Sequence, residues 1–308
     1  MRFAPARLAL LFCALTVLAF ADVIDDVRYL SGIGNFPQAE ARLSAYRSAR
    51  GVTPEYIEAY SWLARTALAA SDNSRAISYA RETRQLAAKL ARTQPLDSEP
   101  HLPVALGAAL EVEAQALTVS GQRSQAIELL RSSLLTYSRT SIRSRLQKNL
   151  NLLSLTGKPA PALQMSEHLG PKPVPLAQLK GKPVLLFFWA HWCGDCKAQG
   201  PILALLRSEY AAKGLVVMAP TQRYGYAAAG DPATPAAELA YIEQVRKQYY
   251  SQLLDLPAPV SQENFNIYGA STTPTLVLIN RSGVVSTYHP GRMTYEELHA
   301  AIDQAFSN

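Results

Sequence analysis

The sequence predicts a chain in two parts, an all-helical first half and a mixed α/β second half. Over residues 22–155, apolar residues recur at spacings of three and four, which is the period of an amphipathic helix. The segment TGKPAPAL at 156–163 then interrupts this pattern with glycine and two prolines, as a linker does. Beyond it, continuous apolar runs such as KPVLLFFWA at 182–190 indicate buried strands.

Length and composition fit this division. A chain of 308 residues is long enough for about two domains. Hydrophobic residues make up 48% and charged residues 18%, as in a soluble globular protein with a sizeable core. The net charge is +6, but no run of five or six basic residues occurs. We therefore interpret the charge as solvated helix surface and expect no nucleic-acid partner.

Residues 1–21 have the pattern of an export signal. Arg2 and Arg7 precede an apolar stretch over 8–20, and Ala19-Phe20-Ala21 fits an A-x-A cleavage site. The apolar stretch is shorter than the roughly twenty residues that span a membrane comfortably. We expect an exported protein, periplasmic or secreted, that is attached to the membrane only if the signal stays uncleaved. Cys13 lies within this signal and would be removed with it.

Residues 22–155 contain paired helices in a degenerate repeat. Segments 61–90 and 106–137 each read as two helices with a short turn, and a weaker copy turns at 32–36. Small residues that let paired helices approach closely recur at the same place in each copy, 37 and then 50 residues apart: Ala39, Ala76 and Ala126. The pattern resembles tetratricopeptide hairpins, whose period is about 34 residues, with a loop insertion at 93–103. An irregular helical bundle is the alternative.

The second half is predicted to alternate strands and helices. Strands are expected at 182–190, 214–220, 275–280 and 284–289, and helices at 201–210, from about 235 to 250, and at 294–306. Residues 221–250 read as an insertion. Thr294 is a predicted helix cap, with Glu297 three residues later. A strand–helix–strand unit followed by a hairpin and a helix indicates a mixed α/β sheet.

Two cysteines, Cys193 and Cys196, remain once the signal is removed, in the stretch FFWAHWCGDCKAQGP at 187–201. At a strand-to-helix junction, the first cysteine of a C-x-x-C lies where free backbone N–H groups and the helix dipole favour its thiolate. The second lies about one turn further and can resolve a mixed disulfide. This spacing predicts a redox pair.

Three other interpretations of the two cysteines compete with this one. A zinc site needs about four ligands, which two distant histidines would have to complete. A c-type haem motif needs histidine directly after the second cysteine, but Lys197 stands there. Two buried, inert cysteines form the third alternative, against which Trp192 and the strand–helix context argue.

These motifs together resemble the thioredoxin superfamily, in particular its exported TlpA/ResA-like branch. The matching stretches are VLLFFWAHWCGDCKAQGP, the preceding LTGKPAPAL, and YGASTTPTLVLINRSGVV at 268–285. The resemblance implies a thioredoxin-like domain over 156–308, after the signal at 1–21 and a helical repeat domain over 22–155. It further implies that Cys193 is the nucleophile and Cys196 the resolving cysteine. Pro274, preceded by Thr273, would be a proline in a cis peptide bond that faces them, and Trp192 belongs to the same active-site stretch.

The sequence departs from this family at two carboxylates. Phe187 stands where thioredoxin has a buried aspartate, and Gln199 stands where the ResA-like branch often has glutamate. Asp195 lies between the cysteines, where many relatives carry proline, and His191 lies two residues before Cys193. Asp195 either exchanges protons or complements the helix dipole, and we favour the second interpretation.

The sequence therefore predicts an exported thiol–disulfide oxidoreductase that reduces or exchanges disulfides in partner proteins. No metal or organic cofactor is implied. One alternative is a partner-binding helical repeat protein with an accessory or regulatory redox domain, and we expect a protein partner on the helical domain. A peroxiredoxin-like antioxidant enzyme is a further alternative. Its signature threonine and proline are replaced here by Ala190 and Leu186.

Overall fold

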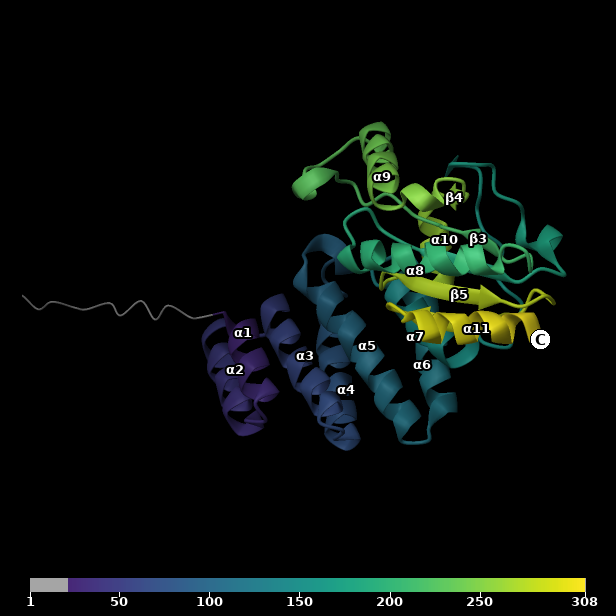
Figure 1. The fold of residues 1–308 in the computed structure, drawn as a ribbon. Coiled ribbons are helices and arrows are strands. Elements are labelled where there is room, and N and C mark those ends of the chain that lie inside the picture. Colours follow the sequence, from purple (N-terminus) through teal and green to yellow (C-terminus); the bar gives the residue numbers. More distant parts are fainter. Residues whose placement is uncertain (1–21, 308) are drawn as a thin grey trace, which may run out of the picture.

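The computed structural model describes residues 22–307, so the predicted export signal lies outside the described residues. Its first half consists of seven α-helices that follow one another in chain order (Figure 1). They are α1 (Val23–Gly32), α2 (Phe36–Arg50), α3 (Pro54–Ala69), α4 (Asn73–Leu90), α5 (His101–Val119), α6 (Arg123–Thr136) and α7 (Arg143–Ser154).

Neighbouring helices of this half pack as hairpins, with α1 on α2, α3 on α4 and α5 on α6. The alanines that recur in the three sequence copies, Ala39, Ala76 and Ala126, are fully buried. Asp72 caps α4 by accepting a hydrogen bond from the Arg75 backbone N–H at 3.0 Å. The all-helical first half and its three hairpins therefore agree with the prediction.

Helix α5 is the central helix of this half. Among residues 22–307 it alone is long and apolar enough to cross a membrane, judged by length and composition. Twelve of its 19 residues are buried, and it contacts α3, α4, α6 and α7. Its apolar character is that of a core helix, surrounded by other helices of the same chain.

The second half is an α/β unit. Its elements are β1 (His168–Leu169), β2 (Val184–Phe188), α8 (Gly194–Tyr210), β3 (Val216–Met218), α9 (Pro235–Tyr249), β4 (Ala258–Pro259), α10 (Gln262–Tyr268), β5 (Thr275–Ile279), β6 (Val285–Pro290) and α11 (Tyr295–Ser307). Four strands form a mixed sheet in the order β3-β2-β5-β6, in which only β2 and β3 are parallel. Strands β1 and β4 form a separate antiparallel pair. The predicted mixed sheet is confirmed.

Strand β2 is buried on both faces of this sheet. Leu185 and Phe187 join a core that includes residues of α8 and α11, whereas Leu186 and Phe188 join a second core with α10. A strand covered on both sides has no solvent-facing positions, which explains its continuous apolar sequence. The strand is consequently the fixed support from which the cysteine segment extends.

Two helices differ from the sequence prediction. Helix α8 begins at Gly194 with Cys193 as its cap, which agrees with the expected place of Cys193 at a helix start. Only the range 201–210 was too short, because Pro201 is accommodated inside the helix. Helix α10 was not predicted, since its seven residues are too few to show a helical period. The predicted cap of α11 is present: Thr294 and Glu297 exchange side-chain-to-backbone hydrogen bonds of 2.8 and 3.2 Å.

Helix α7 joins the two halves by packing on α10. Arg143 makes a bidentate ion pair with Glu263, with N–O distances of 2.8 and 2.9 Å. Gly269, at the end of α10, has a φ of +61° and lies directly on the α7 backbone. A β-carbon at this glycine would come within 2.3 Å of the Lys148 backbone nitrogen. The two halves are therefore held in contact through backbone as well as side chains.

We predict that Gly269→Ala lowers the free energy of unfolding by at least about 2 kcal/mol. A left-handed alanine alone costs about 1–2 kcal/mol, and the contact with the α7 backbone cannot be relieved by a rotamer change. The matched control is Gly121→Ala, where φ is +78° and no atom lies within 4 Å of the added carbon. Urea denaturation followed by circular dichroism measures both. Equal losses would contradict close packing of α7 on α10.

Candidate functional site

The cysteine pair lies where β2 leads into α8. Cys193 is the N-cap residue of α8 and is joined to Cys196 by a disulfide. Its Sγ accepts a hydrogen bond from the Cys196 backbone N–H at 3.0 Å. The free N–H groups and the positive dipole end of the helix are thus directed at this sulfur. After reduction the same groups would stabilise a negative charge on it.

The two cysteines and their flanking residues differ in exposure. Cys193 is 3% exposed and Cys196 is fully buried. Trp192, immediately before the pair, keeps 49% of its surface exposed and contacts the ring of Tyr224 edge-on. The pair is therefore almost fully buried, and Trp192 is its exposed neighbour.

The loop before β5 lies against Cys193. The Thr273–Pro274 peptide bond is cis, and the Thr273 carbonyl oxygen is 3.3 Å from Cys193 Sγ. Thr275 donates a hydrogen bond to the Thr272 carbonyl, and Gly291 donates one to the Pro274 carbonyl, at 2.6 and 2.8 Å. These bonds fix the loop, so residues that are 80 positions apart meet at the sulfur.

Asp195 points to the surface between the cysteines. Its side chain is 69% exposed, and its Oδ1 lies 3.7 Å from Arg292 Nη1. A carboxylate in the first turn of a helix complements the helix dipole. The arginine partially offsets its charge, so the field that Asp195 exerts on Cys193 depends on Arg292.

His191 forms a buried cluster that sequence reasoning did not anticipate. The residue is fully buried, and the rings of Tyr224, Tyr226 and Tyr241 surround it edge-on with centroid distances of 5.3–5.6 Å. Its Nε2 lies 3.3 Å from an oxygen of Glu238 on α9, outside hydrogen-bond geometry. Burial lowers the pKa of His191, against an opposing effect of Glu238.

Glu238 links this cluster to the insertion at 221–250. It is 1% exposed and accepts hydrogen bonds from the backbone N–H groups of Tyr224 and Gly225. These bonds hold two parts of the insertion together, and its contacts with His191 place it against the segment just before the cysteines. The sequence indicated an insertion at 221–250. Residue spacing alone did not indicate which part of the domain this insertion would contact.

Phe187 and Gln199 occupy the positions of the two missing carboxylates. Phe187 is buried and contacts the ring of Tyr250 edge-on at 6.0 Å. Gln199 is fully buried and its Oε1 accepts a hydrogen bond from the Met293 backbone N–H at 3.0 Å. Both residues thus serve packing or loop anchoring. Within residues 22–307, no group of three or more His, Cys, Asp or Glu side chains is placed to hold a metal ion.

Known proteins resemble the α/β half. The Redoxin family model matches residues 155–303. The thioredoxin-like protein YneN of Bacillus subtilis is 30% identical over 152 residues, which cover 48% of this chain and 78% of that protein. The thiol-disulfide oxidoreductase ResA of Oceanobacillus iheyensis is 28% identical, over 51% of this chain and 76% of its own. A crystal structure of a putative DsbE from Chlorobium tepidum is 26% identical, covers 49% of this chain and 96% of its own, and has a TM-score of 0.39.

We predict that His191 makes the protein less stable as the pH falls below about 6.5. Because the pKa of the folded-state imidazole is lowered from 6.5, the unfolded chain takes up a proton first. The stabilisation that depends on neutral His191 is fully present above the pKa that His191 has in the unfolded chain. It is lost as the pH falls from that pKa toward the lower pKa of the folded state. The loss is at most about 1.4 kcal/mol per pH unit. Urea denaturation of wild type and His191→Phe between pH 7.5 and 5.5 measures this loss. If the free energy of unfolding depended on pH in the same way in both proteins, the prediction would be wrong.

Proposed function

The chain belongs to the redoxin family of thioredoxin-like thiol–disulfide oxidoreductases, and we propose that it exchanges disulfides in partner proteins through Cys193 and Cys196. The observation that carries the proposal is the disulfide at the start of α8, with Thr273 and Pro274 against it. An N-terminal helix position favours a reactive thiolate, and a neighbour one turn away supplies the resolving thiol.

In the reducing direction, the Cys193 thiolate attacks one sulfur of a substrate disulfide. A bond forms between Cys193 and that sulfur, and the other substrate sulfur leaves as a thiolate. The Cys196 thiolate then attacks the Cys193 sulfur, which restores the Cys193–Cys196 disulfide and releases the second substrate thiolate. Two electrons pass from the protein to the substrate. The reverse sequence oxidises a substrate dithiol.

We also propose that the protein is exported and has two domains after its signal, 22–155 and 156–308. Arg2, Arg7 and the A-x-A pattern at 19–21 support export. The change from helices to sheet after Ser154 supports the division.

Reduction of insulin by the full chain in the presence of dithiothreitol tests the redox activity. We expect insulin reduction in the presence of Cys193→Ser to be no faster than the reaction without protein. In a second reaction without dithiothreitol, pre-reduced Cys196→Ser should instead accumulate a mixed disulfide with the substrate, because no second thiol is present to resolve it. Non-reducing electrophoresis and mass spectrometry detect that species. If alkylation of the reduced protein at neutral pH modified Cys196 before Cys193, the two roles would have to be exchanged.

We predict that Asp195→Asn raises the redox potential of the pair. Removing a negative charge two residues from Cys193 stabilises its thiolate, which favours the reduced form. The rise should stay below about 20 mV, because exposed charge pairs contribute less than about 1 kcal/mol and about 30 mV corresponds to 1.4 kcal/mol. Equilibration with a glutathione redox buffer measures the potential.

Arg292→Gln is the matched control for this prediction. It leaves the Asp195 charge without its partner at 3.7 Å and should lower the potential. If the redox potentials of the two variants shifted in the same direction, or did not shift beyond error, Asp195 would not tune the potential. Its role would then be limited to stabilising the start of α8.

A further inference from the structure

A cavity of about 350 Å³ lies between the two halves, lined by neither cysteine but by two neighbours of Cys193. Trp192 and Thr273 line it from the α/β half, and Val104 and Arg145 line it from the helical half. We propose that the helical half supplies the second wall of the substrate cleft, and that the cleft binds an extended, acidic polypeptide segment of a disulfide-bonded partner. The inference rests on the proposed function, because it requires that Cys193 react with a partner there.

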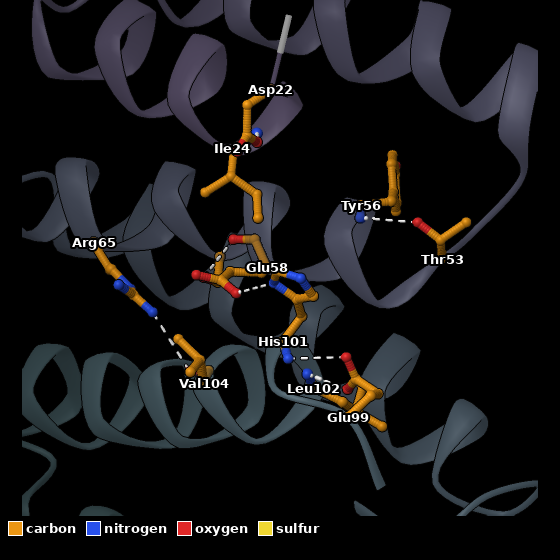
Figure 2. A network of polar contacts seen from close by, with 11 residues as sticks. Asp22, Ile24, Thr53, Tyr56, Glu58, Arg65, Glu99, His101, Leu102 and Val104 are labelled. Carbon is orange, nitrogen blue, oxygen red and sulfur yellow. Dashed lines mark hydrogen bonds and ion pairs between the residues drawn. The ribbon is translucent and has the colours of Figure 1, made fainter. Parts of the chain in front are cut away.

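The start of α5, which carries part of the helical wall, is fixed by polar contacts (Figure 2). The Glu99 carboxylate accepts hydrogen bonds from the backbone N–H groups of His101 and Leu102, at 2.9 and 2.5 Å. His101 Nδ1 lies 2.8 Å from a carboxylate oxygen of Glu58 on α3. These contacts satisfy N–H groups that a helix start leaves free, and they tie α5 to α3.

Arg65 holds the same turn from α3. Its Nη2 donates a hydrogen bond to the Val104 carbonyl oxygen at 3.4 Å (Figure 2), and its guanidinium stacks on the Trp62 ring at 4.3 Å. Burial, and then the neighbouring Arg145, lower the pKa of Arg65 to about 10, so it remains charged at neutral pH. A wall fixed in this way loses little conformational freedom when a segment binds to it.

Arg145 owes its position to a missing side chain on α5. A β-carbon at Gly107 would lie 3.2 Å from Arg145 Cδ and 3.3 Å from Ile142 Cγ2. Arg145 Nε donates a hydrogen bond to Glu111 of α5 at 2.5 Å. Close approach of α7 to α5 and this ion pair together keep the guanidinium at the cavity wall.

The lining suits an extended polypeptide. Val104 and Trp192 keep 38% and 49% of their surfaces exposed, so apolar side chains stand open in opposite walls. Thr273 Oγ1 and Gln222 Oε1 are buried without a hydrogen-bond partner among the described residues. Such atoms cost free energy until they are bonded. Both residues line the cavity, so the backbone groups of a bound segment can satisfy these two atoms once the side chains turn toward it.

The charges of the cleft favour an acidic segment. An adjoining cavity of about 390 Å³ shares Ser141, Ser144 and Gln222 with the first. The two linings together contain Arg139, Arg143 and Arg145, and no aspartate or glutamate. Arg143 and Arg145 are paired with glutamates outside the linings, whereas Arg139 is exposed beside α7. An acidic residue near the substrate cysteine would meet this positive charge.

The test uses residues 22–308 of reduced Cys196→Ser, in which Cys193 is the one remaining cysteine, and nonapeptides whose single cysteine is disulfide-linked to thionitrobenzoate. Cys193 attacks the peptide sulfur, and thionitrobenzoate leaves as a coloured thiolate whose release gives the rate. The reference reagent is the same disulfide of the single amino acid cysteine. The ratio of the rate constant for the peptide to that for the reference reagent measures how much the cleft accelerates the reaction with a peptide. No reaction with the reference reagent would overturn the proposed function, and this inference with it.

We expect Val104→Trp, which fills the cleft from the helical wall, to lower the peptide-to-reference ratio about tenfold, as an overpacked contact does. Ser144→Trp, on the α7 side, should act in the same direction, so a folding defect in one variant does not decide the result. Val119→Trp is the matched control at the other end of α5, where the valine is 71% exposed. If the peptide-to-reference ratio stayed unchanged in both cleft variants, or fell equally in the Val119→Trp control, the helical half would not form a wall of the substrate cleft.

Peptides with glutamate or lysine beside the cysteine test the charge preference. The ratio of glutamate to lysine rate constants should fall by up to about fivefold in Arg139→Gln, as for an exposed ion pair. The same ratio should stay unchanged in Arg131→Gln, an exposed arginine of α6. An equal response of the two variants would overturn the acidic character of the segment.

Discussion

The geometry of the site depends on the burial of β2. Covered by α8 and α11 on one face and by α10 on the other, this strand is packed on both sides of the sheet. The connection that follows it delivers Cys193 to the N-terminus of α8, and its antiparallel partner β5 brings Thr273 and Pro274 to the same end. One buried strand thus places the sulfur, the helix dipole and the facing loop within contact of one another.

The second constraint is the contact of α7 with α10. Because Gly269 lets two backbones touch, the helical half is not a loosely tethered appendage. The position of Val104 and Arg145 opposite Trp192 follows from this contact and from the packing of α5 on α7. Removing residues 22–155 would expose the α7-facing side of α10, and partner selection is therefore better examined in the full chain.

The insertion at 221–250 acts as a cover for the segment before the cysteines. It surrounds His191 with tyrosine rings and places Glu238 beside it, in a region where no carboxylate of the usual family positions is present. Desolvation lowers the pKa of the imidazole, although Glu238 opposes this shift. The same insertion brings Tyr250 against Phe187, so apolar packing replaces the buried carboxylate of thioredoxin.

Local patterns in the sequence determined the helical hairpins, the buried strands, the cap at Thr294 and the place of Cys193 before a helix. Each of these depends on residues within about one or two turns of one another, so periodicity and spacing suffice to reveal them. The His191–Glu238 contact, the packing of Gly269 on Lys148 and the cleft between Val104 and Trp192 were decided only by the tertiary structure. They join residues that are 47 to 121 positions apart, and no local pattern encodes which distant surface a buried or half-buried side chain will meet.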